Sequence, residues 1–178
     1  MIENFKYTDK EKKSLVDSII IIVDTREHEG KNEHIIKYLD KAGVKWCKRK
    51  LDYCDYSFYI PKNEELGIPR DLYFDKKVAI ERKANLEELS RNLTKERERL
   101  EKEFTLGPKT KCMIVENASY EDMVNGNYNT NYNNKSFWAS YHSFSIKYDF
   151  PIFFIKNPKY TGFFIRGYFT YYLKNILR

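Results

Sequence analysis

The chain lacks any long hydrophobic run. No stretch approaches the roughly 18 apolar residues that a membrane-spanning helix needs. The N-terminal residues 1–17 are charged and lack the apolar centre of a secretion signal. The sequence therefore predicts a cytoplasmic protein with no membrane partner.

Cysteine and histidine are scarce, with three residues of each type. The cysteines Cys47, Cys54 and Cys112 are odd in number and widely spaced, which favours reduced thiols over a disulfide framework. Cysteines and histidines together lack the close ligand spacing that is typical of a zinc site. We therefore expect no disulfide, no zinc site and no organic cofactor.

The overall composition is that of a soluble globular protein, with 42% hydrophobic and 33% charged residues. A length of 178 residues predicts a single domain over 1–178, preceded by a polar lead-in at 1–17 that is either helical or loose. The net charge of +6 is compatible with nucleic-acid binding. It does not establish such binding, because the positive and negative charges are interleaved along the chain.

Short apolar runs rich in β-branched residues alternate with stretches of helical periodicity, which predicts an α/β protein. The predicted strands are Ile19–Val23, Val44–Leu51, Tyr56–Ile60, either Leu72–Phe74 or Lys77–Glu81, Lys111–Glu116 and Pro151–Ile155. The predicted helices are Glu33–Lys41, Asn85–Phe104, Ser119–Val124, Ser136–Tyr148 and Tyr160–Leu177.

Two segments leave their roles open. The asparagine-rich stretch 125–134 has too little apolar content to pack, so we expect a loop that is either a mobile surface feature or a flap contacting DNA. The aromatic excess between Phe150 and Tyr172 favours burial or a homodimer interface, with base stacking on unpaired DNA as the alternative.

The segment Val78–Lys83 carries an acid and a lysine one residue apart at the end of an apolar strand. On an extended strand, Glu81 and Lys83 project to the same face and Arg82 projects to the other. Such a triplet alone is a weak signal, since a highly charged protein often places one on a solvated helix. The context strengthens it, because acids also stand next to the ends of two earlier apolar strands, at Asp24 and at Asp55.

These residues resemble the motifs of the XPF/Hef endonuclease domain family. The family pattern runs Asp-x-Arg-Glu, Gly-Asp and Glu-Arg-Lys followed by an acid, and this order and spacing recur from Asp24 through Asp55 to Lys83. Two positions depart from it: Cys54 stands where the family usually has glycine, and Glu87 stands where an aspartate is usual. Short phage-encoded members are similar over nearly the whole chain, which implies a role in recombination, repair or replication.

The resemblance implies a restriction-endonuclease-like α/β fold, with a mixed central sheet flanked by helices. It implies a metal-dependent DNA endonuclease, structure-selective on branched or flap DNA, using Mg²⁺ or Mn²⁺. Relatives often dimerise and carry a tandem helix-hairpin-helix module, for which we expect no residues in this chain. A Holliday-junction resolvase or restriction-type nuclease on this fold is one alternative, and a catalytically silent DNA-binding subunit is another.

The same resemblance assigns roles to individual residues. Asp55 and Glu81 would hold the essential ion, with Glu27 as a further metal ligand. Asp24 would lie beside the same cleft as a secondary metal ligand or an orienting group, with a helix-cap or turn acid as the alternative.

The basic residues are assigned in the same way. Lys83 would orient the attacking water or stabilise charge on the phosphate. Arg82 would either pair with an acid or approach DNA. Arg26 and Arg97 are candidate DNA contacts; Arg97 interrupts the leucine stripe of its helix, so it is either a surface residue or one turned toward the acids.

Overall fold

The computed structural model describes residues 2, 5–27 and 30–177, so positions 1, 3 and 4 of the predicted lead-in lie outside it. The described residues form one seven-stranded sheet with the order β2-β1-β3-β5-β6-β7, in which β4 pairs with β3. The strands are β1 (Ile20–Val23), β2 (Trp46–Lys48), β3 (Tyr56–Ile60), β4 (Leu72–Tyr73), β5 (Val78–Lys83), β6 (Thr110–Glu116) and β7 (Ile152–Ile155).

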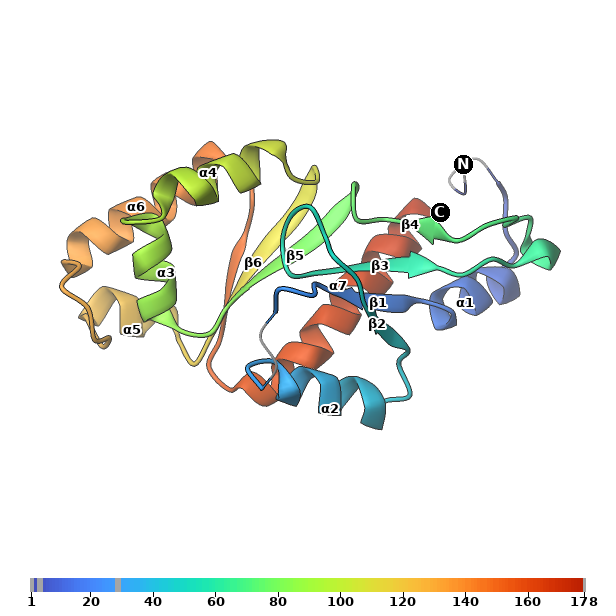
Figure 1. The fold of residues 1–178 in the computed structure, drawn as a ribbon, viewed down its shortest axis with the longest axis horizontal. Coiled ribbons are helices and arrows are strands. Elements are labelled where there is room, and N and C mark those ends of the chain that lie inside the picture. Colours follow the sequence, from blue (N-terminus) through green and yellow to red (C-terminus); the bar gives the residue numbers. More distant parts are fainter. Residues whose placement is uncertain (1, 3–4, 28–29, 178) are drawn as a thin grey trace.

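The sheet is mixed. Strands β5, β6 and β7 run parallel to one another, and β1 runs parallel to β2. Strand β3 is antiparallel to both of its central neighbours, β1 and β5. The predicted mixed sheet flanked by helices is therefore confirmed (Figure 1). The predicted strand after Tyr56–Ile60 had two alternative positions, and both are strands, since β4 and β5 occupy them.

Helices connect and cover these strands. They are α1 (Asp9–Asp17), α2 (Glu33–Lys41), α3 (Leu86–Leu93), α4 (Arg97–Leu106), α5 (Tyr120–Asn125), α6 (Asn134–Lys147) and α7 (Thr161–Ile176), with 3₁₀ turns at Glu64–Leu66 and Pro158–Tyr160. The lead-in is thus helical at α1, where Thr8 and Glu11 form a capping box. None of the described helices combines the length and apolar character needed to cross a bilayer.

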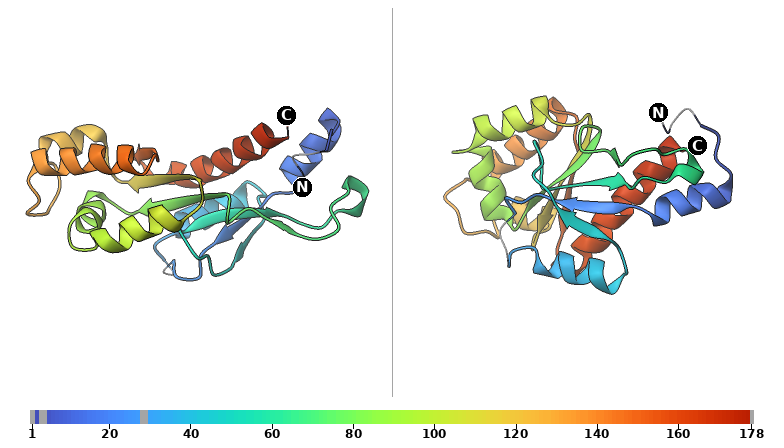
Figure 2. Two further views of the ribbon diagram at one scale, coloured as in Figure 1. Left: turned by 90° about the horizontal axis from the view of Figure 1, so that it is seen from above. Right: turned by 45° about the vertical axis from the view of Figure 1, so that its right-hand side comes forward.

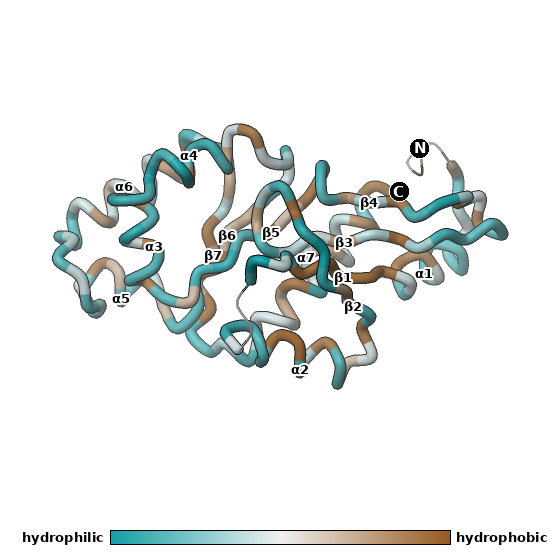
Figure 3. Tube along the Cα trace, in the orientation of Figure 1, coloured by the Kyte–Doolittle hydropathy of each residue, from teal (hydrophilic) through white to brown (hydrophobic). Residues whose placement is uncertain are grey.

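The two faces of the sheet pack into two separate cores. On β6, Cys112 and Ile114 face a cluster that includes α7 residues, whereas Met113 and Val115 face a cluster built with α3 to α6. This alternation follows from the two-residue period of a strand. Helix α7 crosses behind the sheet, while α3 to α6 gather at one end of the molecule (Figures 1 and 2). Hydrophobic residues, drawn in brown, lie along strands such as β1, whereas α3 and α4 are largely hydrophilic (Figure 3).

The prediction of one helix over Asn85–Phe104 is wrong, because the segment forms two helices, α3 and α4. The chain leaves helical geometry at Thr94, whose φ and ψ are −115° and −86°. The Thr94 hydroxyl donates to the Ser90 carbonyl, and the Asn92 amide donates to Glu96. These local side-chain bonds compete with helix continuation. The leucine spacing did not reveal the break, because both helices still bury their leucines in the same core.

The expectation that the asparagine-rich stretch cannot pack is also wrong. Tyr128 and Tyr132 pack against the buried ring of Phe137 in the second core. The backbone N–H of Asn129 donates to Glu87, which ties the stretch to α3. Glu87, the acid at the family's aspartate position, is thereby engaged with this loop.

Candidate active site

A cleft lies between the turn that precedes β3, the end of β5 and helix α4. It brings together six of the residues singled out from the sequence, which are Arg26, Glu27, Asp55, Glu81, Arg82 and Lys83. The turn and β5 are neighbours because β3 and β5 pair at Tyr56 and Ile80. Strand pairing therefore gathers motif residues that lie far apart in the sequence.

Backbone hydrogen bonds fix Asp55 at the floor of this cleft. Its own N–H donates to the Ile80 carbonyl at 3.0 Å, and its carbonyl accepts the Asp24 N–H at 2.8 Å. Its carboxylate Oδ2 accepts the N–H of Arg82 at 2.7 Å. The carboxylate is thus held next to β5 at the position where Glu81 and Lys83 emerge.

The preceding residue, Cys54, has a positive φ of 60°. Glycine adopts this left-handed conformation without steric cost, and a residue with a Cβ is strained there. The N–H of Cys54 donates to the Glu103 carboxylate of α4 at 2.8 Å. Helix α4 therefore helps to hold the strained turn that carries Asp55.

Strand alternation on β5 separates Glu81 and Lys83 from Arg82, as the sequence predicted. Glu81 and Lys83 are each 3% exposed, and the Lys83 ammonium donates to the Glu81 carboxylate. Burial alone lowers the pKa of Lys83, but the attraction of Glu81 and Asp55 outweighs it, so this pKa is raised. Lys83 is therefore a permanent positive charge beside the acids.

The two acids of the cleft are costly to ionise together. Burial is the main cause that raises the pKa of Asp55 well above its usual range, and repulsion by Glu81 adds to it. Burial likewise raises the pKa of Glu81 to about 7, an effect opposed by Lys83 and assisted by the Glu103 charge. A bound cation would offset this cost, which makes the pair suited to a divalent ion.

We expect the metal-free protein to lose stability as the pH rises through this range. The folded protein binds a proton at Glu81 that the unfolded chain has already released, so the unfolding free energy falls between about pH 4.5 and about pH 7. The Glu81 contribution is roughly 3 kcal/mol. Urea unfolding in EDTA across this range should give a shallower fall for Glu81→Gln. Parallel profiles for parent and variant would contradict the assignment.

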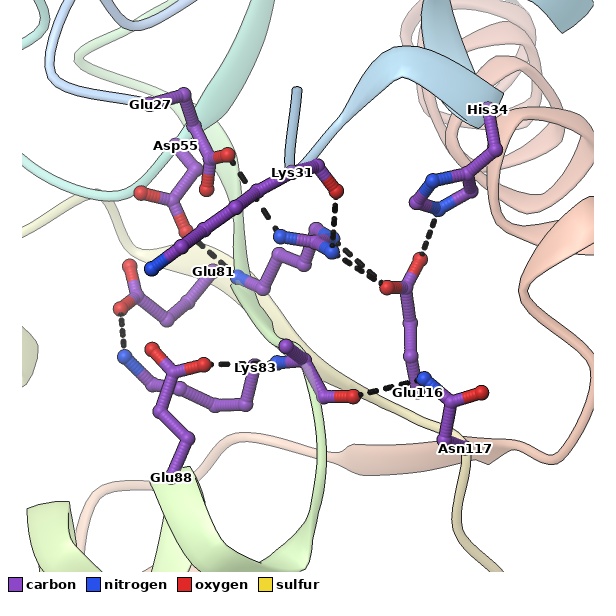
Figure 4. A network of polar contacts seen from close by, with 11 residues as sticks. Glu27, Lys31, His34, Asp55, Glu81, Lys83, Glu88, Glu116 and Asn117 are labelled. Atoms are coloured by element: carbon purple, nitrogen blue, oxygen red, sulfur yellow. Dashed lines mark hydrogen bonds and ion pairs between the residues drawn. The ribbon is translucent and has the colours of Figure 1, made fainter. Parts of the chain in front are cut away.

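Arg82 lies on the opposite face of β5, where it joins a buried network. Figure 4 labels other members of this network, namely Glu27, Lys31, His34 and Glu116. The Nε and Nη2 atoms of Arg82 donate to Oε2 of Glu116 at 3.0 and 2.6 Å. The other Glu116 oxygen lies 2.6 Å from Nε2 of His34. Arg82 also donates to the Lys31 carbonyl at 2.9 Å and lies 3.6 Å from the Glu27 carboxylate. Of the two roles predicted for Arg82, pairing with an acid is the one found.

Glu27 lies at the junction between this network and the cleft. Burial is the main cause that raises its pKa, and the positive charge of Arg82 opposes the effect. Its side chain is 10% exposed. Arg82 therefore positions a further carboxylate beside the Asp55 turn.

Asp24 is buried and is not among the residues that line the cleft. It is 1% exposed and accepts hydrogen bonds from the guanidinium of Arg26 and from the Leu51 N–H. This is the geometry of the alternative in which Asp24 is a turn acid. The bond to Asp24 raises the pKa of Arg26, whose side chain remains 58% exposed at the cleft.

Arg97 does not join the acids. Its side chain is 43% exposed and pairs with Glu101 at 3.0 Å on α4. Arg99, two residues later, lines the cleft, because α4 starts anew at Arg97 and turns a different face inward. The inward alternative for Arg97 is therefore not the one found in this structure.

Several cleft residues were missed by the sequence analysis. They include residues of helices and loops, such as Lys31, Glu88, Arg99, Lys102 and Glu103. No local pattern marks these residues, since only the fold brings them to β5. Glu116 is different, because it ends an apolar strand just as the other acids do, and the same strand-end criterion could have found it.

Comparisons with known proteins agree with the motif analysis. A family model described as the ERCC4 domain matches residues 23–167. The chain is similar to the solved structure of XPF from Aeropyrum pernix, with 18% identity and a TM-score of 0.59, covering 86% of this chain and 61% of that one. It is also similar to XPF from Aeropyrum pernix in complex with DNA, with 18% identity and a TM-score of 0.60, covering 88% of this chain and 66% of that one.

These structural matches concern the fold, because their sequence identity is low. They show that this fold is the restriction-endonuclease-like one expected for such nuclease domains. The chain spans less than two thirds of the length of the first solved chain. Among curated proteins, none matches this sequence.

Proposed function

Because the chain belongs to the ERCC4 domain family, we propose that it is an endonuclease that hydrolyses phosphodiester bonds in DNA with the help of Mg²⁺ or Mn²⁺. The observation that carries this proposal is the convergence of Asp55, Glu81 and Lys83 in one cleft. A binding module gains nothing from a buried and a half-buried carboxylate next to a lysine. The solved similar protein that is in complex with DNA adds support.

The donor set of the cleft fits a hard divalent cation. Asp55 and Glu81 supply carboxylate oxygens, and both have raised pKa values that a cation would lower again. Glu27 lies close enough to influence the pKa of Asp55 and is a candidate for a further ligand. A metal bound here would polarise the phosphate and lower the pKa of bound water. Oxygen donors of this kind prefer Mg²⁺ or Mn²⁺.

The protein groups around the acids have separate tasks in this proposal. Lys83 stabilises the negative charge that gathers on the phosphate and orients the attacking water. Arg82 and Glu116 hold Glu27 in place from the opposite face of β5. Arg99 and Lys102 of α4 lie at the cleft with exposed side chains, where they would contact the DNA backbone.

Branched or flap DNA is the proposed substrate, and residues 1–178 are proposed to act as one nuclease domain. The test is cleavage of labelled single-stranded, duplex, flap, splayed-arm and four-way-junction DNA with Mg²⁺, Mn²⁺ or EDTA. We expect metal-dependent cutting with a preference for branched forms. Binding without cutting on every substrate would instead favour a silent DNA-binding subunit. Sedimentation of the same protein would test the homodimer interface that is one alternative use of its aromatic excess.

Replacing Lys83 with alanine is expected to reduce turnover by about 100-fold while DNA affinity changes little, because an electrostatic catalytic group acts mainly in the transition state. Single-turnover cleavage and binding in the presence of Ca²⁺ separate the two quantities. Lys109→Ala, an exposed lysine outside the cleft, is the matched control. A loss confined to affinity would make Lys83 a phosphate-binding residue without a part in the chemistry.

A further inference from the structure

A second group of potential ligands lies beside the proposed hard-cation site. The Cys54 thiol and the carboxylates of Glu81 and Glu103 have ligand atoms that all lie within 4.8 Å of one another. They come from a turn, a strand and a helix, and all three line the cleft. Cys54 and Glu81 are buried, whereas Glu103 is partly exposed on the α4 side. An ion can therefore reach the group from solvent.

One carboxylate oxygen of this group has no partner. Lys83 donates to Oε1 of Glu81, and Oε2 is buried without a hydrogen-bond partner among the described residues. A buried, unsatisfied carboxylate oxygen is costly, and a cation is one way to satisfy it. Glu81 is only 3% exposed, so this oxygen is a buried acceptor that a bound cation would satisfy.

The chemistry of the donors selects the ion. A thiol is a poor ligand for Mg²⁺ and a good ligand for borderline-soft ions such as Zn²⁺. In a tetrahedral zinc site with bonds of about 2.0–2.3 Å, neighbouring ligand atoms lie about 3.5 Å apart. Separations of at most 4.8 Å therefore need to close by at most about 1.3 Å. Three protein ligands would leave one position for water.

We propose that Cys54, Glu81 and Glu103 form a binding site for Zn²⁺ or a similarly thiophilic divalent cation, which overlaps the hard-cation site of Asp55 and Glu81 at Glu81. Binding releases the thiol proton to solvent, and the thiolate sulfur joins the metal. Because Glu81 belongs to both sites, occupation by Zn²⁺ withdraws a ligand from the Mg²⁺ site. Zn²⁺ would then inhibit DNA cleavage; only this consequence rests on the proposed function.

The test uses Cd²⁺ as an optical probe, because a cadmium–thiolate bond gives an ultraviolet charge-transfer band. The parent protein should show this band and bind Zn²⁺ in calorimetry. Cys54→Gly should remove the band; glycine is well suited to the positive φ at this position, so the variant should fold. Cys54→Ser is the second variant. Cys47→Ser, which removes a thiol on β2, is the control that keeps the band.

Glu103→Gln tests the helix ligand. We expect its Zn²⁺ affinity to fall at least about tenfold, the minimum cost seen when even an outer-shell partner of a metal is lost. The amide oxygen can still accept the Cys54 N–H, so the turn is preserved. A band that persists in Cys54→Ser, a parent without a band, or unchanged affinity in Glu103→Gln would each overturn the proposal.

The inhibition is measured separately from binding. Micromolar Zn²⁺ should suppress Mg²⁺-dependent cutting by the parent and have less effect on Cys54→Gly. If the parent does not cut DNA at all, the nuclease proposal fails while the cadmium band still decides the zinc site. If the parent cuts and shows no band, the zinc site fails alone.

Discussion

Asp55→Asn and Glu81→Gln are each expected to cut DNA at least about 100-fold more slowly than the parent, with the fold retained. Each change keeps the shape of the side chain and removes the charge that would hold the metal. The amide introduced by Asp55→Asn still offers an oxygen to the Arg82 N–H, so the turn keeps its hydrogen bond. Cleavage rates at saturating metal, measured on the preferred DNA form, give the result.

Stability separates this loss of activity from simple damage to the protein. Burial is the main cause that raises the pKa values of both acids, with repulsion by Glu81 adding to it at Asp55 and repulsion by Glu103 adding to it at Glu81. Their ionised forms are therefore unfavourable in the metal-free fold. The neutral amide of Asp55→Asn should therefore leave the metal-free protein at least as stable as the parent near neutral pH. Glu81→Gln also removes the carboxylate that accepts the hydrogen bond of the buried Lys83, so it should be the less stable of the two variants. Denaturant unfolding in EDTA measures this. The parent should also gain more stability from Mg²⁺ than either variant.

Asp149→Asn is the matched control, since it makes the same chemical change at an exposed position outside the cleft. Asp149 has a φ of 48°, a conformation that asparagine also tolerates. We expect cleavage by this variant to equal that of the parent. Residual activity above about a hundredth of the parent in Asp55→Asn would argue against Asp55 as a principal ligand.

The part of the site that lies on strands could be predicted from the sequence. The two-residue period of β5 places Glu81 and Lys83 on one face and Arg82 on the other, and this is what the structure contains. Apolar runs of β-branched residues predicted where the strands lie. Acids at the ends of these strands predicted that the site lies at one end of the sheet. The motif spacing then supplied the family.

The helical contribution to the site could not be predicted in the same way. The leucine stripe continues from α3 into α4, so periodicity alone predicted one continuous helix. A continuous helix would point the side chains after Thr94 in directions that differ from those in the structure. Only the break turns Arg99 and Glu103 toward the cleft and leaves Arg97 outside it. A break made by local side-chain hydrogen bonds has no signature in a pattern of apolar residues.

The proposed thiol site has no sequence signature for a related reason. Its three potential ligands are separated by 27 and 22 residues in the chain, from Cys54 to Glu81 and from Glu81 to Glu103. Pairing of β3 with β5 and packing of α4 bring them within 4.8 Å. The spacing of residues along the chain can identify sites that are built on one hairpin or one helix. It cannot identify sites whose residues are brought together only by tertiary contacts.

Replacing Glu116 with alanine is expected to reduce the free energy of unfolding by roughly 3–5 kcal/mol, because it leaves a buried cation without its main partner. The Arg82 side chain is 5% exposed and Glu116 is 1% exposed. Without Glu116, Arg82 retains only the Lys31 carbonyl and the more distant Glu27 carboxylate among the described contacts. Urea unfolding of parent and variant at one pH measures the difference.

Glu98→Ala is the control for this measurement. Glu98 is an exposed acid on α4, and a surface substitution of this kind usually changes stability by less than about 0.5 kcal/mol. If Glu116→Ala were equally harmless, Arg82 would have to reach solvent or another acid after the change. The buried network would then have no structural role.

The double variant Arg82→Met, Glu116→Leu distinguishes two explanations of the loss. A buried ion pair stabilises little relative to apolar groups of similar volume, whereas an unpaired buried charge is costly. The double variant should therefore be more stable than Glu116→Ala alone, even though Glu27 and His34 lose a neighbour. Cleavage by the double variant should nevertheless be low, because the Arg82 side chain that holds Glu27 beside Asp55 is gone. Recovered stability without recovered cleavage would assign the Arg82–Glu116 pair to the positioning of the site, and full recovery of both would limit the pair to the fold.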